Sequence, residues 1–264
     1  MQNVTIVINT LGRINKQVTY NNLPPSIRDM VLFSVQQQEY PQYLTAGFST
    51  NQLLVLPTEI TNLTATRQWL IENVLTRFLI IMDDDLTFFT RKEETGAKKL
   101  YKMTPAEHEQ MFQDMLEFLE MYPMVGISSR EGNQNEPLNV KLVGRSMRIF
   151  GLDLDVVRSN GFRFDRTKTK EDMDMTLQIL RAGYRNAVFY QYANDHGSSN
   201  AAGGCSNYRT LELMKEDAHV LAGLHPGFVT VVEKSTKTSW NGMTRTDVRV
   251  AWKKAYESSQ RKEA

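Results

Sequence analysis

The central segment of the sequence reads Phe78-Leu79-Ile80-Ile81-Met82-Asp83-Asp84-Asp85-Leu86. Its five consecutive apolar residues are too few for a helix core, and charged residues flank them. A short apolar run of this kind is typical of a strand that is buried on both faces, as the strands of parallel sheets are. The segment therefore predicts a parallel α/β sheet in which three carboxylates follow a central strand.

These three aspartates have two interpretations. Like charges that lie close together raise one another's pKa, so a positive group is expected among Asp83, Asp84 and Asp85 when the site works. A divalent cation is the simplest such group, because carboxylate oxygens suit Mg²⁺ or Mn²⁺, and Mg²⁺ commonly binds one or two carboxylates together with substrate phosphates. The alternative is an Asp-rich turn after a strand, which is a frequent use of aspartate. Both interpretations stay open for this segment taken alone.

Length and composition favour one α/β domain with a tail. A chain of 264 residues with 41% hydrophobic residues has enough apolar side chains for a proper core. We expect a main domain at residues 1–232 and a basic C-terminal segment at 233–264 that packs on this domain or extends from it. The formal net charge of +1 excludes a protein that binds nucleic acid through its overall charge.

The cysteine content and the distribution of apolar residues indicate a cytoplasmic protein. Cys205 is the only cysteine, so an internal disulfide is excluded and a reducing compartment is favoured. The N-terminus lacks the basic and apolar regions of a signal peptide. No segment approaches the roughly 20 apolar residues that cross a bilayer, so no membrane partner is expected.

The N-terminal segment predicts a nucleotide-binding edge of the sheet. The β-branched run Val4–Ile8 indicates the first strand, and a polar turn from Asn9 to Arg13 follows it. In an open α/β sheet, ligands lie beyond the carboxyl ends of the strands, so Asn9, Thr10 and Arg13 are candidate donor-binding residues. Arg13 would pair with a phosphate, although a solvated loop arginine is the more common arrangement.

Alternating strands and helices are expected between this turn and the aspartates. We predict a helix from Pro24 or Pro25 to about Gln38, a strand at 53–56, and a helix that begins near Ala65 with Thr64 as its cap. Arg67 would then lie in the first turn of that helix, where a guanidinium and the helix N-terminus favour an anion. A surface arginine is the alternative. This right-handed parallel layout is of a kind that binds nucleotides, but the layout alone does not define a function.

Further elements are predicted after the aspartates. The charged segment at 91–103 indicates a loop, either a mobile lid or an idle surface loop. Thr104-Pro105-Ala106-Glu107 is a capping box that begins a helix. Strands are expected at 124–129 and 143–150, with a loop between them that an acceptor could contact.

A second acidic group precedes a later helix. Thr169 is a candidate cap, and Glu171 and Asp172 would occupy the first turn, where the helix dipole favours their ionised form. A carboxylate in this position could hold an acceptor hydroxyl and take its proton. Acidic residues that only stabilise a helix N-terminus are the alternative.

In this order along the first 200 residues, the motifs resemble those of GT-A glycosyltransferases. The resemblance implies a Rossmann-like, mostly parallel central sheet flanked by helices, with donor-binding residues on the nucleotide-binding half. It implies that Asp83, Asp84 and Asp85 bind a divalent metal, Mn²⁺ or Mg²⁺, that bridges the diphosphate of a UDP-sugar. His196, which follows the expected strand at 187–192, would complete the metal site with Asp83 and Asp85. The acid that opens the later helix in this family serves inverting members as general base, which implies catalytic roles for Asp172 and its neighbour Glu171.

A narrower resemblance involves the segments that follow this strand. Asp195-His196-Gly197-Ser198-Ser199, Gly203-Gly204-Cys205-Ser206 and Tyr208-Arg209 are similar to motifs of the phage glycosyltransferases associated with TET-type hydroxylases. This resemblance implies that the protein transfers a sugar to 5-hydroxymethylcytosine in DNA. Free backbone amides of the Gly-rich segment could approach phosphate oxygens closely, and a flexible surface loop is the alternative.

The C-terminal segment adds a local positive charge. From Lys234 onward, eight lysines and arginines stand against three acidic residues, an excess of five. Cations interleaved with tryptophan suit contact with a nucleic-acid backbone and stacking on an extruded base. The candidate acceptor residues are Arg209, Lys237, Trp240 and Arg245. Alternatively, the apolar residues of this segment pack a final element against the core and the cations are solvated.

Three other functions compete with sugar transfer to DNA. The first is a glycosyltransferase with a glycan or protein acceptor. The second is a metal-dependent nuclease or nucleotidyltransferase, because clustered carboxylates also build two-metal sites. The third is a non-catalytic DNA-binding protein whose aspartates only end a strand.

Overall fold

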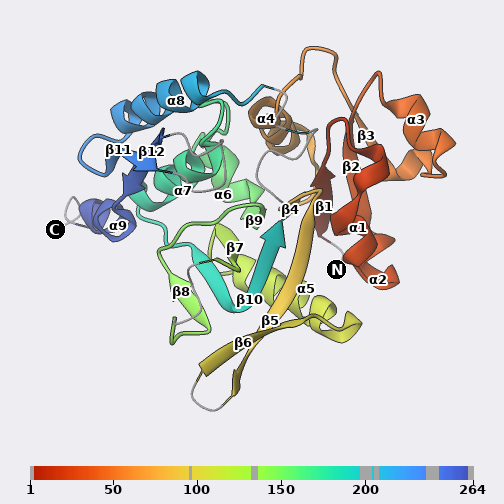
Figure 1. The fold of residues 1–264 in the computed structure, drawn as a ribbon, viewed down its shortest axis with the longest axis horizontal. Helices are drawn as coiled ribbons and strands as arrows, with labels where there is room; N and C mark the ends of the chain where they lie inside the picture. The colour runs from red at the N-terminus through yellow and green to blue at the C-terminus, as the bar shows by residue number, and fades with distance from the viewer. Residues whose placement is uncertain are drawn as a thin grey trace.

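A ten-stranded mixed sheet forms the centre of the molecule (Figure 1). The computed structural model describes residues 3–94, 97–131, 136–196, 204, 208–235 and 244–260 of the chain. The strand order is β3-β2-β1-β4-β9-β7-β10-β5-β6, and β8 pairs with β10 outside this path. The strands of this sheet are β1 (Val4–Asn9), β2 (Val31–Gln36), β3 (Leu53–Leu56), β4 (Phe78–Asp83), β5 (Leu86–Glu94), β6 (Ala97–Lys102), β7 (Met124–Ser129), β8 (Val140–Leu142), β9 (Ile149–Asp153) and β10 (Ala187–His196).

Helices lie on both sides of the sheet, and a separate two-stranded sheet lies near the C-terminus (Figure 1). The α-helices are α1 (Val18–Asn22), α2 (Pro25–Arg28), α3 (Tyr40–Thr45), α4 (Leu63–Asn73), α5 (Pro105–Leu119), α6 (Leu154–Ser159), α7 (Glu171–Arg181), α8 (Leu211–Leu224) and α9 (Trp252–Gln260). Two short 3₁₀ helices are η1 (Ile14–Lys16) and η2 (Thr50–Gln52), and the second sheet consists of β11 (Val229–Ser235) and β12 (Thr244–Val250).

The direction of the strands confirms the expected mostly parallel sheet. β1, β2, β3 and β4 pair in parallel, and β7 and β10 run in the same direction beyond the antiparallel β9. β1 and β4 lie side by side, with Asn9 opposite Asp83 in the register. The polar turn after β1 and the aspartates after β4 therefore meet at the same edge of the sheet, as in other open α/β sheets that bind ligands.

The central strand β4 is buried on both faces, as its sequence predicts. Ile80 and Met82 pack in the cluster that includes Met111 and Phe112 of α5. Leu79 and Ile81 pack in the opposite cluster, whose helical residues are Leu70 and Ile71 of α4, Leu154 and Val157 of α6, and Met175 and Ile179 of α7. Because side chains alternate along a strand, both layers of the core are anchored on this one segment. This packing on both faces of β4 fixes the position of Asp83 at the end of the strand.

The predicted helix between residues 25 and 38 is wrong beyond its first turn. α2 ends at Arg28, and the chain continues as β2, which pairs in parallel with β1 from Ile6 opposite Val31 to Asn9 opposite Ser34. Val31-Leu32-Phe33-Ser34-Val35 is rich in β-branched and aromatic residues, which suit a buried strand. Tertiary pairing with β1 thus outweighs the helical spacing of the apolar residues.

Two further predictions are wrong. The segment at 91–103, expected as a loop, forms much of the antiparallel pair β5–β6, in which Arg91 lies opposite Leu100. The strand expected at 143–150 begins only at Ile149, as β9, because Val143 and Arg148 have a φ of 64° and cannot continue a strand. By contrast, the capping box is confirmed: the Thr104 hydroxyl accepts from the Glu107 amide at 3.3 Å, and the Glu107 carboxylate accepts from the Thr104 amide at 2.8 Å.

The C-terminal elements pack around α7. Leu177 and Leu180 of α7 share one apolar cluster with Leu221 of α8, Val229 of β11, Val248 of β12 and Ala255 of α9. The division expected between residues 232 and 233 falls inside β11, so it cuts a strand that pairs with β12. Among the described residues, no helix combines the length and the apolar character that a membrane span needs.

Candidate active site

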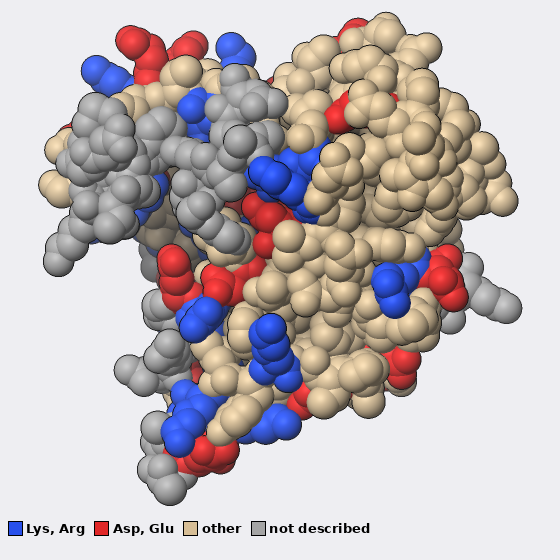
Figure 2. All heavy atoms as spheres, turned by 45° about the vertical axis from the view of Figure 1, so that its right-hand side comes forward, with Lys and Arg blue, Asp and Glu red and all other residues tan. Residues whose placement is uncertain are grey.

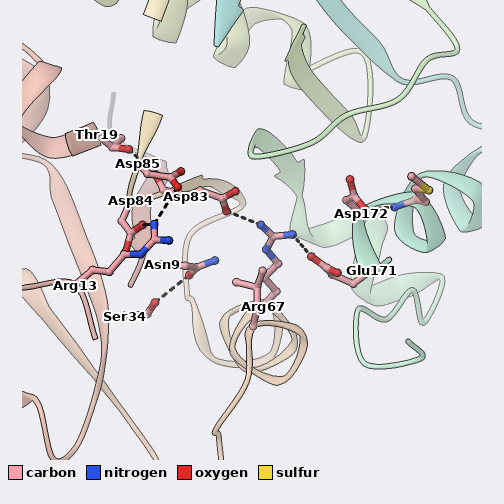
Figure 3. A network of polar contacts seen from close by, with 12 residues as sticks. Asn9, Arg13, Thr19, Ser34, Arg67, Asp83, Asp84, Asp85, Glu171 and Asp172 are labelled. Atoms are coloured by element: carbon pink, nitrogen blue, oxygen red, sulfur yellow. Dashed lines mark hydrogen bonds and ion pairs between the residues drawn. The ribbon is translucent and has the colours of Figure 1, made fainter. Parts of the chain in front are cut away.

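Thr19 of α1 fixes the turn that carries the aspartates (Figure 3). Its hydroxyl donates to the carbonyl oxygen of Asp83 at 2.5 Å and accepts from the amide of Leu86 at 2.8 Å. Its own amide donates to the carbonyl oxygen of Asp84 at 3.0 Å. The backbone of the turn is thus held from the side, and the three carboxylates leave it in different directions (Figure 3).

Arg13 lies between the second and the third aspartate. Its Nη1 donates to Asp84 Oδ1 at 2.8 Å and to Asp85 Oδ2 at 2.9 Å. The Asp84 side chain is only 7% exposed, and this burial raises its pKa to about 6 although Arg13 opposes the shift. The arginine predicted to contact a phosphate therefore binds two of the predicted acidic residues in this conformation.

Arg67 connects the first aspartate to the second acidic group (Figure 3). Its side chain is 2% exposed, with Nη2 at 2.9 Å from Asp83 Oδ1 and Nη1 at 2.7 Å from Glu171 Oε1. Burial raises the pKa of Asp83 and of Glu171, and Arg67 counteracts both shifts. One buried guanidinium therefore joins the end of β4 to the start of α7.

The predicted cap of α4 is wrong, and the position of Arg67 changes with it. Asn62 caps this helix, because its Oδ1 accepts from the amide of Ala65 at 2.9 Å. α4 begins at Leu63, so Arg67 lies in its second turn rather than its first. Arg67 is also buried rather than on the surface, with its guanidinium 5.1 Å from the centre of the Phe150 ring.

Asn9 and Thr10 lie at the end of β1 and are buried. Asn9 Oδ1 accepts from the Ser34 hydroxyl of β2 at 2.9 Å, and among the described residues its Nδ2 has no hydrogen-bond partner. Thr10 Oγ1 lies 3.0 Å from the hydroxyl of Tyr43 and accepts from Gln17 Nε2 at 2.9 Å. Both residues line the cavity described below, and Asn9 keeps a donor for a ligand.

Glu171 and Asp172 occupy the first turn of α7, as predicted, but the cap differs. Lys170 is the N-cap residue, and Thr169 donates instead to Asp217 Oδ2 at 2.7 Å. Asp172 accepts from Arg145 Nη2 at 3.0 Å and from the amide of Met173 at 2.9 Å. Burial acts to raise the pKa of Asp172, but Arg145, Arg67 and the Met173 amide together outweigh it, so the pKa lies below its usual value.

His196 ends β10 opposite Leu86, the residue that follows the aspartates. Its Nε2 lies 3.1 Å from Arg148 Nη2, and burial and the charge of Arg148 lower its pKa. Arg148 accepts a backbone hydrogen bond from the Asp83 amide at 2.8 Å while its φ is 64°. Strained non-glycine backbone of this kind persists only where the surroundings fix it, and it is common near active sites.

A cavity of about 720 Å³ brings most of the predicted site residues together. Figure 2 shows acidic and basic side chains side by side in the hollow at the middle of one face. The predicted residues that line the cavity are Asn9, Thr10, Arg13, Arg67, Asp83, Asp84, Asp85, Glu171, Asp172, His196, Arg209 and Arg245. The other two, Lys237 and Trp240, lie outside the described residues, as do most positions of the Gly-rich segment.

The donor chemistry of the cavity suits a hard divalent cation. Asp83 and Asp85 have side chains that are 30% and 24% exposed, and His196 adds an imidazole at the same sheet edge. In this conformation, however, the carboxylates bind Arg13 and Arg67, and the described residues contain no three acidic, His or Cys side chains grouped as metal ligands. An ion at this edge would therefore share these carboxylates with the arginines or displace them.

Three further basic residues line the cavity that no sequence pattern marked as site residues: Arg145, Arg148 and Lys170. Arg145 and Arg148 lie in a segment that was expected to be a regular strand. Arg145 pairs with a residue 27 positions away, a contact for which the chain has no local pattern. For Lys170, the only available signal of a role in the site was its position next to the acidic pair Glu171 and Asp172.

The fold is similar to that of two solved proteins whose structures contain uridine nucleotides. TarS of S. aureus, in a structure with UDP-GlcNAc, shares the fold with a TM-score of 0.50 and 11% identity, over 84% of this chain and 67% of that chain. Glucosyl-3-phosphoglycerate synthase of Mycobacterium tuberculosis, in a structure with Mn²⁺, UDP and phosphoglyceric acid, has a TM-score of 0.51 and 11% identity, over 95% of this chain and 90% of that chain.

The chain belongs to the TET-associated glycosyltransferase family, whose model matches residues 4–204. The chain is also similar to two curated phage proteins, each a β-glucosyl-HMC-α-glucosyl-transferase. The identity is 22% for the protein of Enterobacteria phage T6 and 21% for that of Enterobacteria phage T2, in each case over 190 residues. The match covers 67% of this chain and 65% of each relative, so a third of those proteins lies outside it.

Proposed function

We propose that the protein transfers a sugar from a UDP-sugar to 5-hydroxymethylcytosine in DNA, with Mn²⁺ or Mg²⁺ as cofactor. The observation that carries the proposal is the shared cavity, which is lined by the three aspartates at the end of β4 and by Glu171 and Asp172, and in which Arg67 joins Asp83 to Glu171 (Figure 3). The family name and the phage relatives support a sugar-transferring role on hydroxymethylated DNA.

The sheet edge at β1 and β4 is the proposed donor side. Asp83, Asp85 and His196 would hold the divalent cation, which would neutralise charge that develops on the leaving diphosphate. Asn9 and Thr10 line the same edge, and the side-chain amide of Asn9, whose oxygen accepts from Ser34, would donate to the nucleotide. Arg13 and Arg67, together with Asp84, would set the charge around the phosphates.

Asp172 is the proposed general base. Arg145 and the amide of Met173 hold its carboxylate ionised and oriented in the wall of the cavity. In an inverting displacement, the hydroxymethyl oxygen forms a bond to the anomeric carbon, the bond from that carbon to the diphosphate breaks, and Asp172 takes the hydroxyl proton. Glu171, bound to Arg67, would position this part of the site.

The acceptor would enter from the side of α8 and the C-terminal hairpin. Arg209 and Arg245 line the cavity there, and Lys237 and Trp240 are proposed to assist them. The target base must leave the stack to reach the carboxylates. The reaction would take place in the cytoplasm, which is that of the host if the chain is encoded by a phage.

A second acceptor is favoured by the names of the phage relatives, which include a β-glucosyl-HMC. The protein would then add a sugar to one that is already attached to the modified base. A hydroxyl of that sugar would replace the hydroxymethyl group in the scheme above, and Asp172 would again take the proton.

Mass spectrometry of nucleosides tests the proposal. DNA with 5-hydroxymethylcytosine, the same DNA after β-glucosylation, and cytosine DNA are each incubated with the protein, Mn²⁺ and a panel of sugar nucleotides. The proposal predicts a sugar adduct on one of the modified nucleosides and none on cytosine. Free nucleotide without any DNA adduct would point to a glycan or protein acceptor, and nicked plasmid would support a nuclease.

A further inference from the structure

Lys170 is a buried lysine with no partner among the described residues. Its exposed fraction is 4%, and no hydrogen bond or ion pair joins its ammonium to a described residue, although Asp247, Asp217 and Asp172 act on its charge from a distance. It lines the same cavity as Glu171 and Asp172, which directly follow it in the chain. Lysine side chains are almost never buried without a partner, because removing an ammonium from water costs several kcal/mol.

The acidic groups around Lys170 are bound to other donors. Asp217 accepts from the Thr169 hydroxyl at 2.7 Å and from the Lys168 amide at 3.1 Å. Asp247 accepts from Lys234 at 2.9 Å. These carboxylates favour a positive charge at Lys170 from a distance, but none of them satisfies its N–H groups.

The remaining acid of this group, Asp172, is bound to Arg145. Burial lowers the pKa of Lys170, and the charges of Asp247, Asp217 and Asp172 oppose the shift. The ammonium is thus costly to keep charged without an anion and well placed to receive one.

Two arginines complete a basic wall on this side of the cavity. Arg209 precedes α8 and Arg245 belongs to β12, and both line the cavity with Lys170. The Nε of each arginine is buried and has no hydrogen-bond partner among the described residues. Arg245 also donates to Asp247 through Nη2 at 3.2 Å, so part of its guanidinium is engaged. Figure 1 places α8 and the β11–β12 hairpin together beside α7, on the side of the molecule opposite to β3.

We propose that Lys170, Arg209 and Arg245 form a phosphate-binding subsite that holds one backbone phosphodiester of the acceptor strand beside the target base. The inference rests on the proposed function, because it names how that site takes its DNA acceptor. Three cations with free N–H groups match the oxygens of a phosphodiester. The donor diphosphate is assigned to the opposite edge, at the end of β4, so the two phosphate sites would lie on either side of the reacting atoms.

Binding of labelled single-stranded DNA tests the subsite. The probe is a fluorescein-labelled oligonucleotide with one 5-hydroxymethylcytosine, and anisotropy gives its affinity at several salt concentrations. The variant Lys170→Met loses one charge, and Lys253→Met is the matched control because Lys253 is 85% exposed on α9. We expect Lys170→Met to bind about tenfold more weakly. Its plot of log affinity against log salt should be shallower by about 0.7, the value for one phosphate contact on a single strand. Lys253→Met should bind as the wild type does.

A second probe identifies the phosphate. Oligonucleotides with one uncharged methylphosphonate linkage, placed in turn on each side of the modified base, should lose affinity for the wild type at one position. At that position Lys170→Met should lose less affinity than the wild type, because only Arg209 and Arg245 remain to contact the phosphate. Thermal unfolding separates this role from a structural one. Removing an unpaired buried ammonium should leave the melting temperature unchanged or raise it, whereas the loss of a structural residue would lower it.

Several outcomes would overturn the subsite. The first is that Lys170→Met has the DNA affinity and salt slope of the wild type. The second is that Lys170→Met binds UDP more weakly and DNA as well as the wild type does. The third is weaker DNA binding that is explained by a lowered melting temperature. The proposed function fails separately. If the wild type binds the oligonucleotide through Lys170 but transfers no sugar, only the proposed activity is contradicted. If the wild type and Lys170→Met transfer sugar equally well, only the subsite is contradicted.

Discussion

Replacement of Arg67 by methionine should destabilise the protein strongly, because Arg67 is the shared partner of two carboxylates. Its guanidinium lies 2.9 Å from Asp83 and 2.7 Å from Glu171, with only 2% of the side chain exposed. Methionine fills much of the same space beside Phe150, so the main loss is the charge and its hydrogen bonds. The two acids would then face each other across the cavity without a cation between them.

The burial of the partners sets the magnitude. The Glu171 side chain is 8% exposed, and breaking a buried ion pair from one side typically costs about 3–5 kcal/mol. The Asp83 side chain is 30% exposed, so solvent compensates part of its loss and we add less than about 1 kcal/mol for it. We therefore expect Arg67→Met to lower the free energy of unfolding by about 4 kcal/mol near neutral pH. The cost should shrink in acid, because Glu171, whose pKa is already raised by burial, takes a proton instead of staying ionised.

Urea unfolding of four proteins measures this effect: the wild type, Arg67→Met, Glu171→Gln and the double variant. If Glu171 is the main unpaired charge, the double variant should recover about 2 kcal/mol relative to the sum of the single changes. Additive costs, or an Arg67→Met variant within about 1 kcal/mol of the wild type, would refute the reasoning. The amide substitution controls for the shape of the glutamate.

Three further changes have expected outcomes of their own. Asp84 has a pKa of about 6, against an ordinary value of 3.8, so the folded protein binds its proton more tightly than the unfolded chain does. The stability that the protonated Asp84 contributes is therefore lost as the pH rises from about 4 to 6. The stability of Asp84→Asn relative to the wild type should therefore rise by about 3 kcal/mol over that range in urea unfolding; a pH-independent difference would contradict this. Asp172→Asn should lower the turnover of sugar transfer by about 10²–10⁴-fold with unchanged affinity for UDP, whereas normal turnover would exclude Asp172 as the base and favour a retaining mechanism. Gly126→Ala should cost about 1–3 kcal/mol, because the new Cβ would lie 2.6 Å from the buried Ser146 hydroxyl oxygen; thermal unfolding at the wild-type temperature would show that Ser146 can move aside.

The parts of the fold that local patterns determine could be predicted from the sequence. The run Phe78–Met82 is apolar at every position, as a strand buried between two helical layers requires, and it forms most of β4. The capping box at Thr104 and Glu107 satisfies backbone groups within one turn, so it does not depend on the rest of the chain. The acids at the start of α7 were found for the same reason.

Features that depend on distant partners could not be predicted. β2 has apolar residues at spacings that fit a helix, and only its pairing with β1 makes it a strand. The link from Arg67 to both acidic groups spans 104 residues on one side and 16 on the other. Arg145 contacts Asp172 from a segment that has left-handed backbone at Val143 and Arg148, and neither of these residues is a glycine or asparagine that would indicate such a conformation.

A crystal structure of the protein with UDP and Mn²⁺ tests the central claim most directly. We predict one ion between the carboxylates of Asp83 and Asp85 and the diphosphate, with Arg13 turned away from at least one of the acids that it binds in the present structure. A nucleotide bound elsewhere, or bound at this edge while both arginines keep their carboxylates and no ion is present, would contradict the account.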